Sequence, residues 1–277
     1  MSDTVILITG ASSGIGESAA RLLATEPQAR LILVARREER LRALASELGP
    51  GTTWVAADLV DDDAPGRIRA HVEEHHGRLD LLVNNAGAAW RARFSEGGYA
   101  NVKRTMELNF DAQVRLTEAL LPLLRRSAPS AVVNVGSTAG RVARPGSGAY
   151  SASKFALAGW SDALWAEERD HGVHVGLVQP GFIATEGFPA QELVANPWTR
   201  WLVSTPETVA RAIRDAGLRR RAERYVPRPY GAIAVVRHVA PWLLRRVIGG
   251  AAGGAMVTRT GADAAEARSQ ESTSPQG

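Results

Sequence analysis

The 277-residue sequence predicts an α/β fold in which helices cover both faces of a doubly wound parallel sheet. Two observations carry this prediction. Short apolar runs rich in Val, Ile and Leu alternate with longer stretches of helical character, which is typical of parallel strands joined by crossover helices. Most of these runs end in Gly, Asn, Asp, Ser or Pro, and ligands of doubly wound sheets bind at the carboxyl ends of the strands.

The composition excludes several classes of protein. The chain has no cysteine and its six histidines lack metal-ligand spacing, so we expect neither disulfides nor a metal site. No basic segment precedes the first strand, and no stretch reaches the ~18 uncharged apolar residues of a spanning helix, which predicts a cytoplasmic protein. The pI of 9.9 comes with a formal charge of only +4 and dispersed arginines, which argues against a nucleic-acid partner.

The first apolar run, Thr4 to Thr9, predicts a buried strand, and a helical pattern follows from Glu17 to Ala24. A glycine-rich turn lies between them. Glycines permit close approach of the backbone to a phosphate, and a helix N-terminus supplies free N–H groups and a positive dipole end. We therefore predict nucleotide binding by Gly10, Ser12, Ser13, Gly14, Ile15 and Gly16.

The second strand, Arg30 to Ala35, is followed by Arg36 and Arg37. A sheet that binds NAD carries an acidic residue near this point for the ribose hydroxyls. Arginine instead binds a 2′-phosphate with charge-assisted hydrogen bonds, so the sequence favours NADP(H) over NAD(H). Alternatively, the arginines only begin the solvated helix from Glu38 to Leu48, and we expect one of the two to do so.

The third strand, Thr52 to Ala57, ends at Asp58 and Leu59. Asp58 either meets an adenine amino group or caps the polar helix of residues 61–77. The fourth strand, Leu79 to Val83, ends in two amides and a glycine, a combination suited to holding backbone and cofactor together. Cofactor contacts are predicted for Asn85, Ala86 and Gly87, with a structural role for at least one asparagine.

A long helix is predicted from Tyr99 to Arg126, with Asn109 inside its apolar pattern. A buried amide needs a hydrogen-bond partner, since unpaired burial costs ~1–3 kcal/mol. The fifth strand, Ala131 to Val135, ends at Gly136 and Ser137. After a helix from Tyr150 to about Asp170, the sixth strand runs from Val173 to Val178 and ends at Gln179, Pro180 and Gly181.

Tyr150 and Lys154 lie four residues apart on the same face of the predicted helix. A free tyrosine has a pKa near ~10, and a cation one turn away favours the phenolate and lowers that pKa. The pair therefore indicates a proton-transfer device. The alternative is a solvated pair on an exposed helix. The residues around the pair decide between these two interpretations.

These motifs together resemble the classical branch of the short-chain dehydrogenase/reductase family over residues 3 to 227. The resemblance rests on the Gly10–Gly16 turn, Asn84 to Gly87, Asn109, Ser137, Tyr150 with Lys154, and Pro180-Gly181 followed by Thr185. It implies a single-domain, three-layer Rossmann fold with a seven-stranded parallel sheet. The last helix and strand would be Pro206 to Arg219 and Arg224 to Pro227. Two departures from the family pattern are Gly136, where the family often has Ser, and Gln179 before Pro180.

The resemblance also implies roles. Tyr150 would be the general acid in carbonyl reduction, and Lys154 would lower its pKa and hydrogen-bond the nicotinamide ribose. Ser137 would hold the substrate oxygen, and Asn109 would keep a water in the proton relay, which would be the partner that its burial demands. Pro180, Gly181, Ile183 and Thr185 would lie by the nicotinamide, Asp58 and Leu59 by the adenine, and Arg36 rather than Arg37 by the phosphate.

The substrate pocket is predicted to include Ser137, Trp90, Gln179, Phe182 and Phe188, with the family's substrate lid falling at residues 182–205. Large apolar side chains there favour a hydrophobic ketone or secondary alcohol, although ordinary core packing explains any one of them equally well. The family further implies a homo-oligomer, a dimer or tetramer formed through the helices that bear Asn109 and Tyr150. A non-catalytic, NADP(H)-sensing protein on the same fold is the alternative of a different class.

Beyond a catalytic domain of residues 1–228, residues 229–249 predict an amphipathic helical extension, and residues 250–277 a flexible tail that cannot bury a core. Pro241 is expected to kink or divide the extension. Apolar residues with helical spacing, among them Ile233 and Val236, lie beside Arg237, Arg245 and Arg246. This pattern suits either contact with a membrane surface, as in a lipid or steroid dehydrogenase, or a helix that covers the pocket or a neighbouring subunit.

Overall fold

The computed structural model describes residues 3–184 and 203–249. Its main sheet has seven parallel strands in the order β3-β2-β1-β4-β5-β6-β9, which confirms the predicted doubly wound sheet. Each strand begins and ends within about two residues of its predicted bounds. The strands are β1 Thr4–Thr9, β2 Ala29–Ala35, β3 Thr52–Ala56, β4 Leu81–Asn84, β5 Ser130–Val135, β6 Val173–Pro180 and β9 Glu223–Val226.

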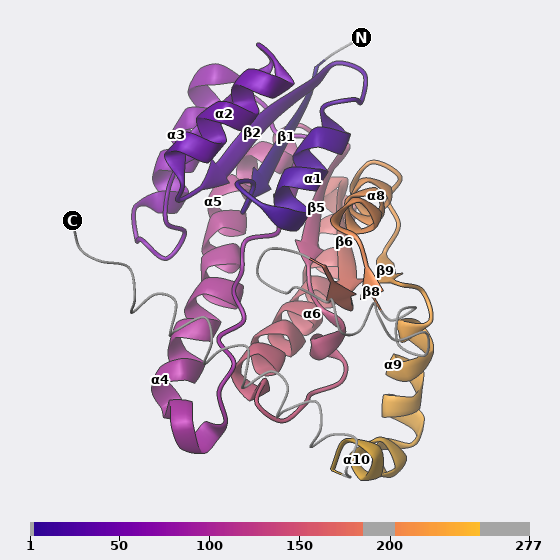
Figure 1. Ribbon diagram of the computed structural model, residues 1–277. Helices are drawn as coiled ribbons and strands as arrows, with labels where there is room; N and C mark the ends of the chain where they lie inside the picture. The colour runs from indigo at the N-terminus through magenta and orange to yellow at the C-terminus, as the bar shows by residue number, and fades with distance from the viewer. Residues whose placement is uncertain (1–2, 185–202, 250–277) are drawn as a thin grey trace, which may run out of the picture.

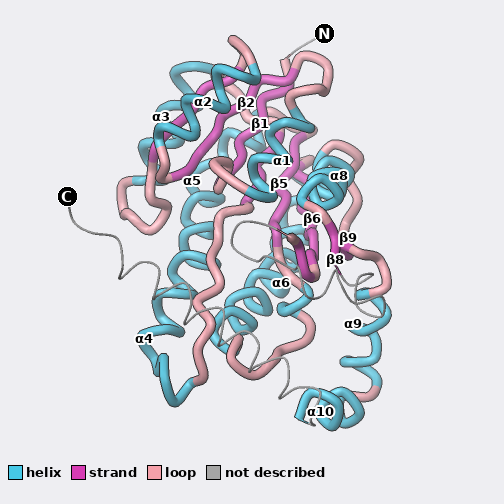
Figure 2. Tube along the Cα trace, in the orientation of Figure 1, coloured by secondary structure: helices cyan, strands magenta, loops and turns pink. Residues whose placement is uncertain are grey.

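Helices cover both faces of this sheet, as Figures 1 and 2 show. Alternate strand residues point to opposite faces, so Ile6 and Ile8 enter one buried cluster while Val5 and Leu7 enter the other. The first cluster packs under α1 (Gly14–Leu23), α2 (Glu38–Leu48) and α8 (Pro206–Gly217). The second packs under α3 (Ala64–His75), α5 (Ala112–Arg126) and α6 (Gly148–Glu168).

The order of the strands reverses between β1 and β4. From β1 the chain winds outward through β2 and β3, and then returns to place β4 on the other side of β1. Crossover loops therefore leave β1 and β4 in opposite directions, which opens a crevice above their carboxyl ends. The fold thus places the glycine-rich turn after β1 opposite the Asn84–Gly87 segment after β4.

The long helix predicted from Tyr99 to Arg126 is divided in the structure. It consists of α4 (Phe94–Met106), a π-helical turn (Glu107–Asp111) and α5. A π turn holds one extra residue, and such turns occur frequently at functional sites. Here the turn carries Asn109, which the sequence pattern alone placed within a regular helix.

The C-terminal part adds elements beyond the main sheet. Two short strands, β7 (Phe182–Ile183) and β8 (Val203–Ser204), pair with each other beside the ends of β6 and β9. The predicted extension forms α9 (Tyr230–Val239) and α10 (Pro241–Gly249), divided at Pro241 as expected. Both helices lie at the end of the molecule away from α2 and α3 (Figure 1). Within residues 3–184 and 203–249, no helix is long and apolar enough to cross a membrane.

Candidate functional site

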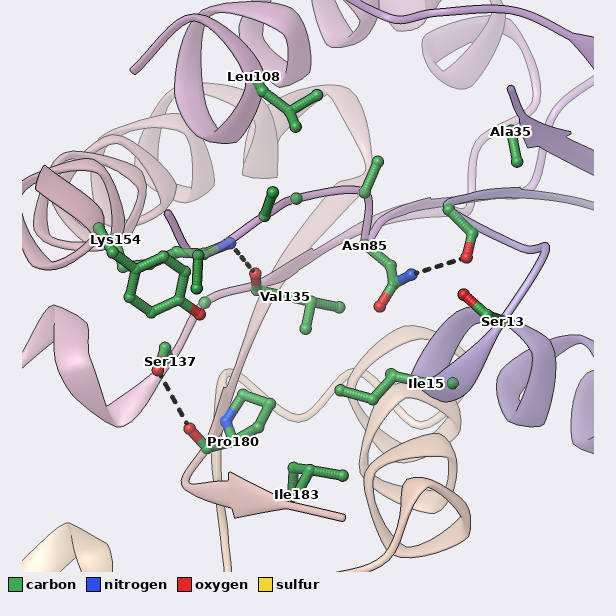
Figure 3. Close-up of a pocket in the computed structure, with 18 of the residues that line it drawn as sticks. Ser13, Ile15, Ala35, Asn85, Leu108, Val135, Ser137, Lys154, Pro180 and Ile183 are labelled. Carbon is green, nitrogen blue, oxygen red and sulfur yellow. Dashed lines mark hydrogen bonds between the residues drawn. The ribbon is translucent and has the colours of Figure 1, made fainter. Parts of the chain in front are cut away.

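A cavity of about 710 Å³ opens at the carboxyl ends of the strands. It brings together most of the residues that the sequence marked as functional. Figure 3 shows Ser13 and Ile15 at one side of it and Ser137 and Lys154 at the other. The predicted residues that line it are Gly10, Ser12, Ser13, Gly14, Ile15, Arg36, Arg37, Asp58, Leu59, Asn85, Ala86, Gly87, Ser137, Tyr150, Lys154, Pro180, Gly181, Phe182 and Ile183.

The glycine-rich turn forms a cradle for an anion. Gly10 and Gly14 have φ angles of +66° and +56°, a left-handed conformation that favours glycine. The side chain of Ser13 does not cap α1, so the first amides of that helix stay available to a ligand. Gly16 does not line the cavity. A Cβ atom there would clash with the carbonyl oxygen of Gly10, so Gly16 lets the helix pack against the turn.

Of the two neighbouring asparagines, Asn85 lies at the cavity and Asn84 has a structural position. Asn85 lines the cavity and ties β4 to β1, because its Nδ2 donates to the Thr9 carbonyl at 2.9 Å and its backbone N–H donates to Thr9 Oγ1 at 2.9 Å. Asn84 is fully buried, and its Nδ2 donates to Thr117 and Asn134, each at 2.9 Å. Asn84 is thus the structural asparagine.

Arg36 and Arg37 also differ in their surroundings. Arg37 donates from Nε and from a terminal nitrogen to Ser12 Oγ at 3.2 and 3.1 Å, so it braces the glycine-rich turn. The side chain of Arg36 is 74% exposed and lies 3.6 Å from the Asp58 carboxylate at the rim of the cavity. Both the anion cradle and this exposed guanidinium are groups able to hold a phosphate.

Ser137 and Lys154 lie at the other side of the cavity (Figure 3), and Tyr150 lines the same cavity. Ser137 Oγ accepts from the Ala139 N–H at 3.1 Å and donates to the Pro180 carbonyl at 3.4 Å. Lys154 is buried at the base, where its ammonium donates to the Val135 carbonyl at 2.9 Å. The ammonium lies 5.9 Å from the centre of the Tyr150 ring.

The pKa values of the pair differ from the expectation. Burial raises the pKa of Tyr150, and the Ser137 hydrogen bond and the charges of Arg144 and Arg91 oppose that effect. Burial also lowers the pKa of Lys154, to about 8. The spacing of the pair predicts only the effect of the cation, whereas desolvation of both groups is the largest influence in this cavity.

Asn109 is fully buried, and its amide is occupied by protein groups. Its Oδ1 accepts from the Ala88 N–H at 2.8 Å, and its Nδ2 donates to the Ala88 carbonyl at 2.9 Å and to Ser153 Oγ at 3.2 Å. The family resemblance implied a water as the partner of this amide. The structure instead makes Asn109 a brace for the loop after β4, because the π turn carries it to that loop.

Two predicted pocket residues, Trp90 and Gln179, do not line the cavity. The ring of Trp90 stacks instead under the guanidinium of Arg104, at 5.0 Å. Gln179 is fully buried behind the site, where its Oε1 accepts from the Ser137 N–H at 2.8 Å. Of the remaining predictions, Thr185 and Phe188 fall outside the described residues.

The two departures from the family pattern compensate each other. A Cβ atom at Gly136 would lie 2.5 Å from Gln179 Oε1, so the amide that holds the Ser137 backbone requires a glycine beside it. Larger side chains at these two positions compete for one space.

Gly136→Ala is therefore expected to displace the Gln179 amide and to lower turnover about tenfold, because Ser137 loses the hydrogen bond that positions it. Gln179→Ala should cause a similar loss. The double variant should turn over no more slowly than either single variant, because an alanine at position 179 leaves room for the methyl group added at position 136. Steady-state kinetics of the four proteins test this, and fully additive losses would show that the two residues act independently.

Several residues that line the cavity were not predicted from the sequence. Arg91, Leu108, Val135, Arg144 and Ser147 line it although no motif marks them. Tyr230, the first residue of α9, packs on Gly181, where a Cβ atom would clash with its ring. The extension therefore begins inside the site. Only the position of Arg144, in the Gly- and Pro-rich loop before Tyr150, could have pointed to it.

Comparisons with known proteins show the family to which this chain is similar. A family model described as short chain dehydrogenase matches residues 4–193. Dehydrogenase/reductase SDR family member 7B of Bos taurus is 36% identical over 192 residues, which cover 66% of this chain and 59% of that protein. The uncharacterized oxidoreductase YxnA of Bacillus subtilis is 34% identical over 260 residues, covering 90% and 72% of the two chains.

Two further similarities extend the comparison. The ketoacyl reductase HetN of a Nostoc species is 31% identical over 211 residues, covering 75% of this chain and 73% of that protein. Among solved structures, a short-chain dehydrogenase from Streptomyces avermitilis superposes with a TM-score of 0.74 at 30% identity. That match covers 87% of this chain and 96% of the other.

Proposed function

Because this chain belongs to the short-chain dehydrogenase/reductase family of oxidoreductases, which use nicotinamide cofactors, we propose that it interconverts a carbonyl and an alcohol with NADP(H). The observation that carries the proposal is one cavity that holds the glycine-rich turn at one side and Ser137, Tyr150 and Lys154 at the other. Such a cavity joins a cradle for a dinucleotide to groups able to move a proton.

The cofactor would be held by the α1 N-terminus and Asn85, with Arg36 at its 2′-phosphate, and it would supply the hydride. Ser137 Oγ would donate a hydrogen bond to the substrate oxygen. Tyr150 would give its hydroxyl proton to that oxygen during reduction and take it back during oxidation. Both residues line the same cavity, and the Ser137 hydroxyl lowers the pKa of Tyr150.

Lys154 would act through its charge and its fixed position. Its ammonium is anchored by the Val135 carbonyl, next to the Tyr150 ring. When Tyr150 loses its proton, a nearby cation stabilises the phenolate that forms. Arg144 and Arg91 add positive charge that acts in the same direction. Asn109 would keep the Ala88 loop in place beside the reacting groups.

The test is consumption of NADPH and NADH by the purified protein with ketones, aldehydes, quinones, 3-oxoacyl thioesters and 3-oxosteroids. The thioesters are included because the similar Nostoc protein is a ketoacyl reductase. Turnover of any carbonyl with NADPH supports the proposal. Tight NADPH binding without turnover of any compound would favour the alternative, a protein that senses the cofactor without catalysis.

The exposed apolar surface of α9 and α10 favours a second role, attachment of the enzyme to an anionic membrane surface. Val239 and Trp242 are 76% and 68% exposed, and Val235 and Leu243 are exposed beside them. Arg245 and Arg246 are also exposed on α10. Apolar side chains rimmed by arginines match the headgroup layer of anionic lipids.

We expect the full-length protein to sediment with phosphatidylserine vesicles, and Trp242→Ser to weaken that binding roughly tenfold. The reason is that the exposed Trp242 side chain would become buried in the headgroup layer on binding, and its apolar surface would contribute much of the binding free energy. Leu218→Ser is the control, since Leu218 is exposed at the end of α8, outside both the extension and the expected subunit contact. Truncation before Tyr230 is a poor test, because it removes the ring that packs on Gly181. Equal binding of all three proteins would exclude this surface.

A homo-oligomer and a cytoplasmic location complete the proposal. Exposed aromatic residues on the helices expected to form the subunit contact, Tyr99 on α4 with Phe155 and Trp165 on α6, favour association. The mass of the protein in solution distinguishes a dimer from a tetramer.

A further inference from the structure

The cavity has two positively charged ends. Arg36 and Arg37 line the end near the glycine-rich turn, and Arg91 and Arg144 line the end near Tyr150. Ala35 and Lys154 mark these ends in Figure 3. Among the described lining residues Asp58 is the one carboxylate, and it lies beside Arg36. The NADP(H) proposal accounts for the first pair of arginines and gives no role to the guanidinium of Arg144.

Arg144 is held in place by its loop. The Ser147 N–H donates to the Arg144 carbonyl at 3.2 Å, which closes a turn just before α6. The Ala92 N–H donates to the Gly146 carbonyl at 3.0 Å, so the loop that carries Arg91 is tied to the loop that carries Arg144. The guanidinium of Arg144 lies 4.7 Å from the centre of the Phe182 ring, on the cavity wall.

Within residues 3–184 and 203–249, no carboxylate forms an ion pair with Arg144. Burial and the charge of Arg91 lower its pKa, and only the hydroxyls of Tyr230 and Tyr150 oppose them. Arg141, three residues earlier in the same loop, is paired with Glu223 at 2.9 Å. A half-buried cation without a counter-charge is costly, and a bound anion removes that cost.

We propose that Arg144 binds an anionic group of the substrate, so that the preferred carbonyl compounds are oxo acids bearing a carboxylate or a phosphate. This inference rests on the proposed function. A guanidinium presents two parallel N–H groups that match either anion. With the carbonyl oxygen at Ser137 and Tyr150, the anion would lie toward Phe182 and Arg144, and Arg91 would add its charge at the same end.

The experiment compares matched substrates, a series of 2-oxo and 3-oxo acids with their methyl esters, and the corresponding oxo phosphonates. Wild type, Arg144→Leu, Arg144→Gln and Arg144→Lys are assayed with NADPH. Wild type should favour the acid over its ester by about 10- to 100-fold in kcat/KM, the usual size of a charge-assisted contact. Arg144→Leu and Arg144→Gln should lower ester turnover to some extent, because Arg144 also stabilises the Tyr150 phenolate, but they should lower acid turnover about tenfold more and so lose the preference. Arg144→Lys should retain part of it.

Arg141→Leu is the matched control, because it removes the same charge from the same loop outside the cavity lining. Its acid-to-ester ratio should equal that of wild type. The ranking of carboxylates against phosphonates identifies which anion the site takes. Equal turnover of acid and ester by wild type, or an equal loss of both in Arg144→Leu, would overturn the inference.

Calorimetric binding of the acid and the ester to the NADP⁺-loaded protein separates this inference from the proposed function. If no compound turns over, acid-specific binding that disappears in Arg144→Leu still supports an anion site at Arg144. Equal or absent binding of the two compounds would overturn it. Turnover confined to neutral ketones would overturn the anion site and leave the reductase intact.

Discussion

Tyr150→Phe should lower carbonyl turnover by about a thousandfold or more, because a positioned general acid contributes 10²- to 10⁴-fold and this hydroxyl is the proton donor in the proposed mechanism. The ring remains to fill its place. Ser137 Oγ keeps its partners at the Ala139 N–H and the Pro180 carbonyl, so the loss of the hydroxyl leaves no buried group unpaired. The measurement is kcat with the best carbonyl substrate, alongside the dissociation constant of NADPH.

The dissociation constant should change by less than about twofold, since the phosphate cradle lies at the other side of the cavity. Tyr99→Phe is the control, because Tyr99 is exposed on α4 and does not line the cavity. A Tyr150→Phe protein that retains a tenth of wild-type turnover would remove Tyr150 from the mechanism. A loss of NADPH binding would instead point to a damaged fold.

Arg36→Asp should reduce the preference for NADPH over NADH by about a hundredfold. A charge-assisted hydrogen bond is worth ~1.5–3 kcal/mol, and the new carboxylate beside Asp58 would repel a 2′-phosphate as well. The same change gives the ribose hydroxyls of NADH an acceptor. The ratio of kcat/KM for the two cofactors, measured with one substrate, reports the effect.

Two further variants separate the arginines. Arg37→Leu should weaken NADPH and NADH alike, because Arg37 braces Ser12 in the glycine-rich turn. Arg42→Asp, an exposed site on α2 that does not line the cavity, should leave the ratio unchanged. If Arg36→Asp leaves the ratio intact while Arg37→Leu lowers it, the phosphate contact belongs to Arg37.

The membership of this chain in its family and its sheet follow from the sequence because they depend on local patterns. Buried parallel strands need continuous apolar runs such as Thr4–Thr9, and glycine is needed where φ is positive, as at Gly10 and Gly14. The spacing of Tyr150 and Lys154 fixes their common face on one helix. These features require only neighbours along the chain, so they can be predicted without a tertiary structure.

Contacts between distant segments are decided only by the folded chain. Asn109 is a brace because a π turn brings it to Ala88, and Gln179 supports Ser137 from behind rather than lining the pocket. Arg144 differs from Arg141 only in what faces it, a cavity rather than Glu223. Burial, and not spacing, sets the pKa of Tyr150 and Lys154. Hydrogen bonds, ion pairs and desolvation depend on which side chains lie next to each other in space. Those neighbours come from segments far apart in the sequence, so local sequence patterns do not reveal them.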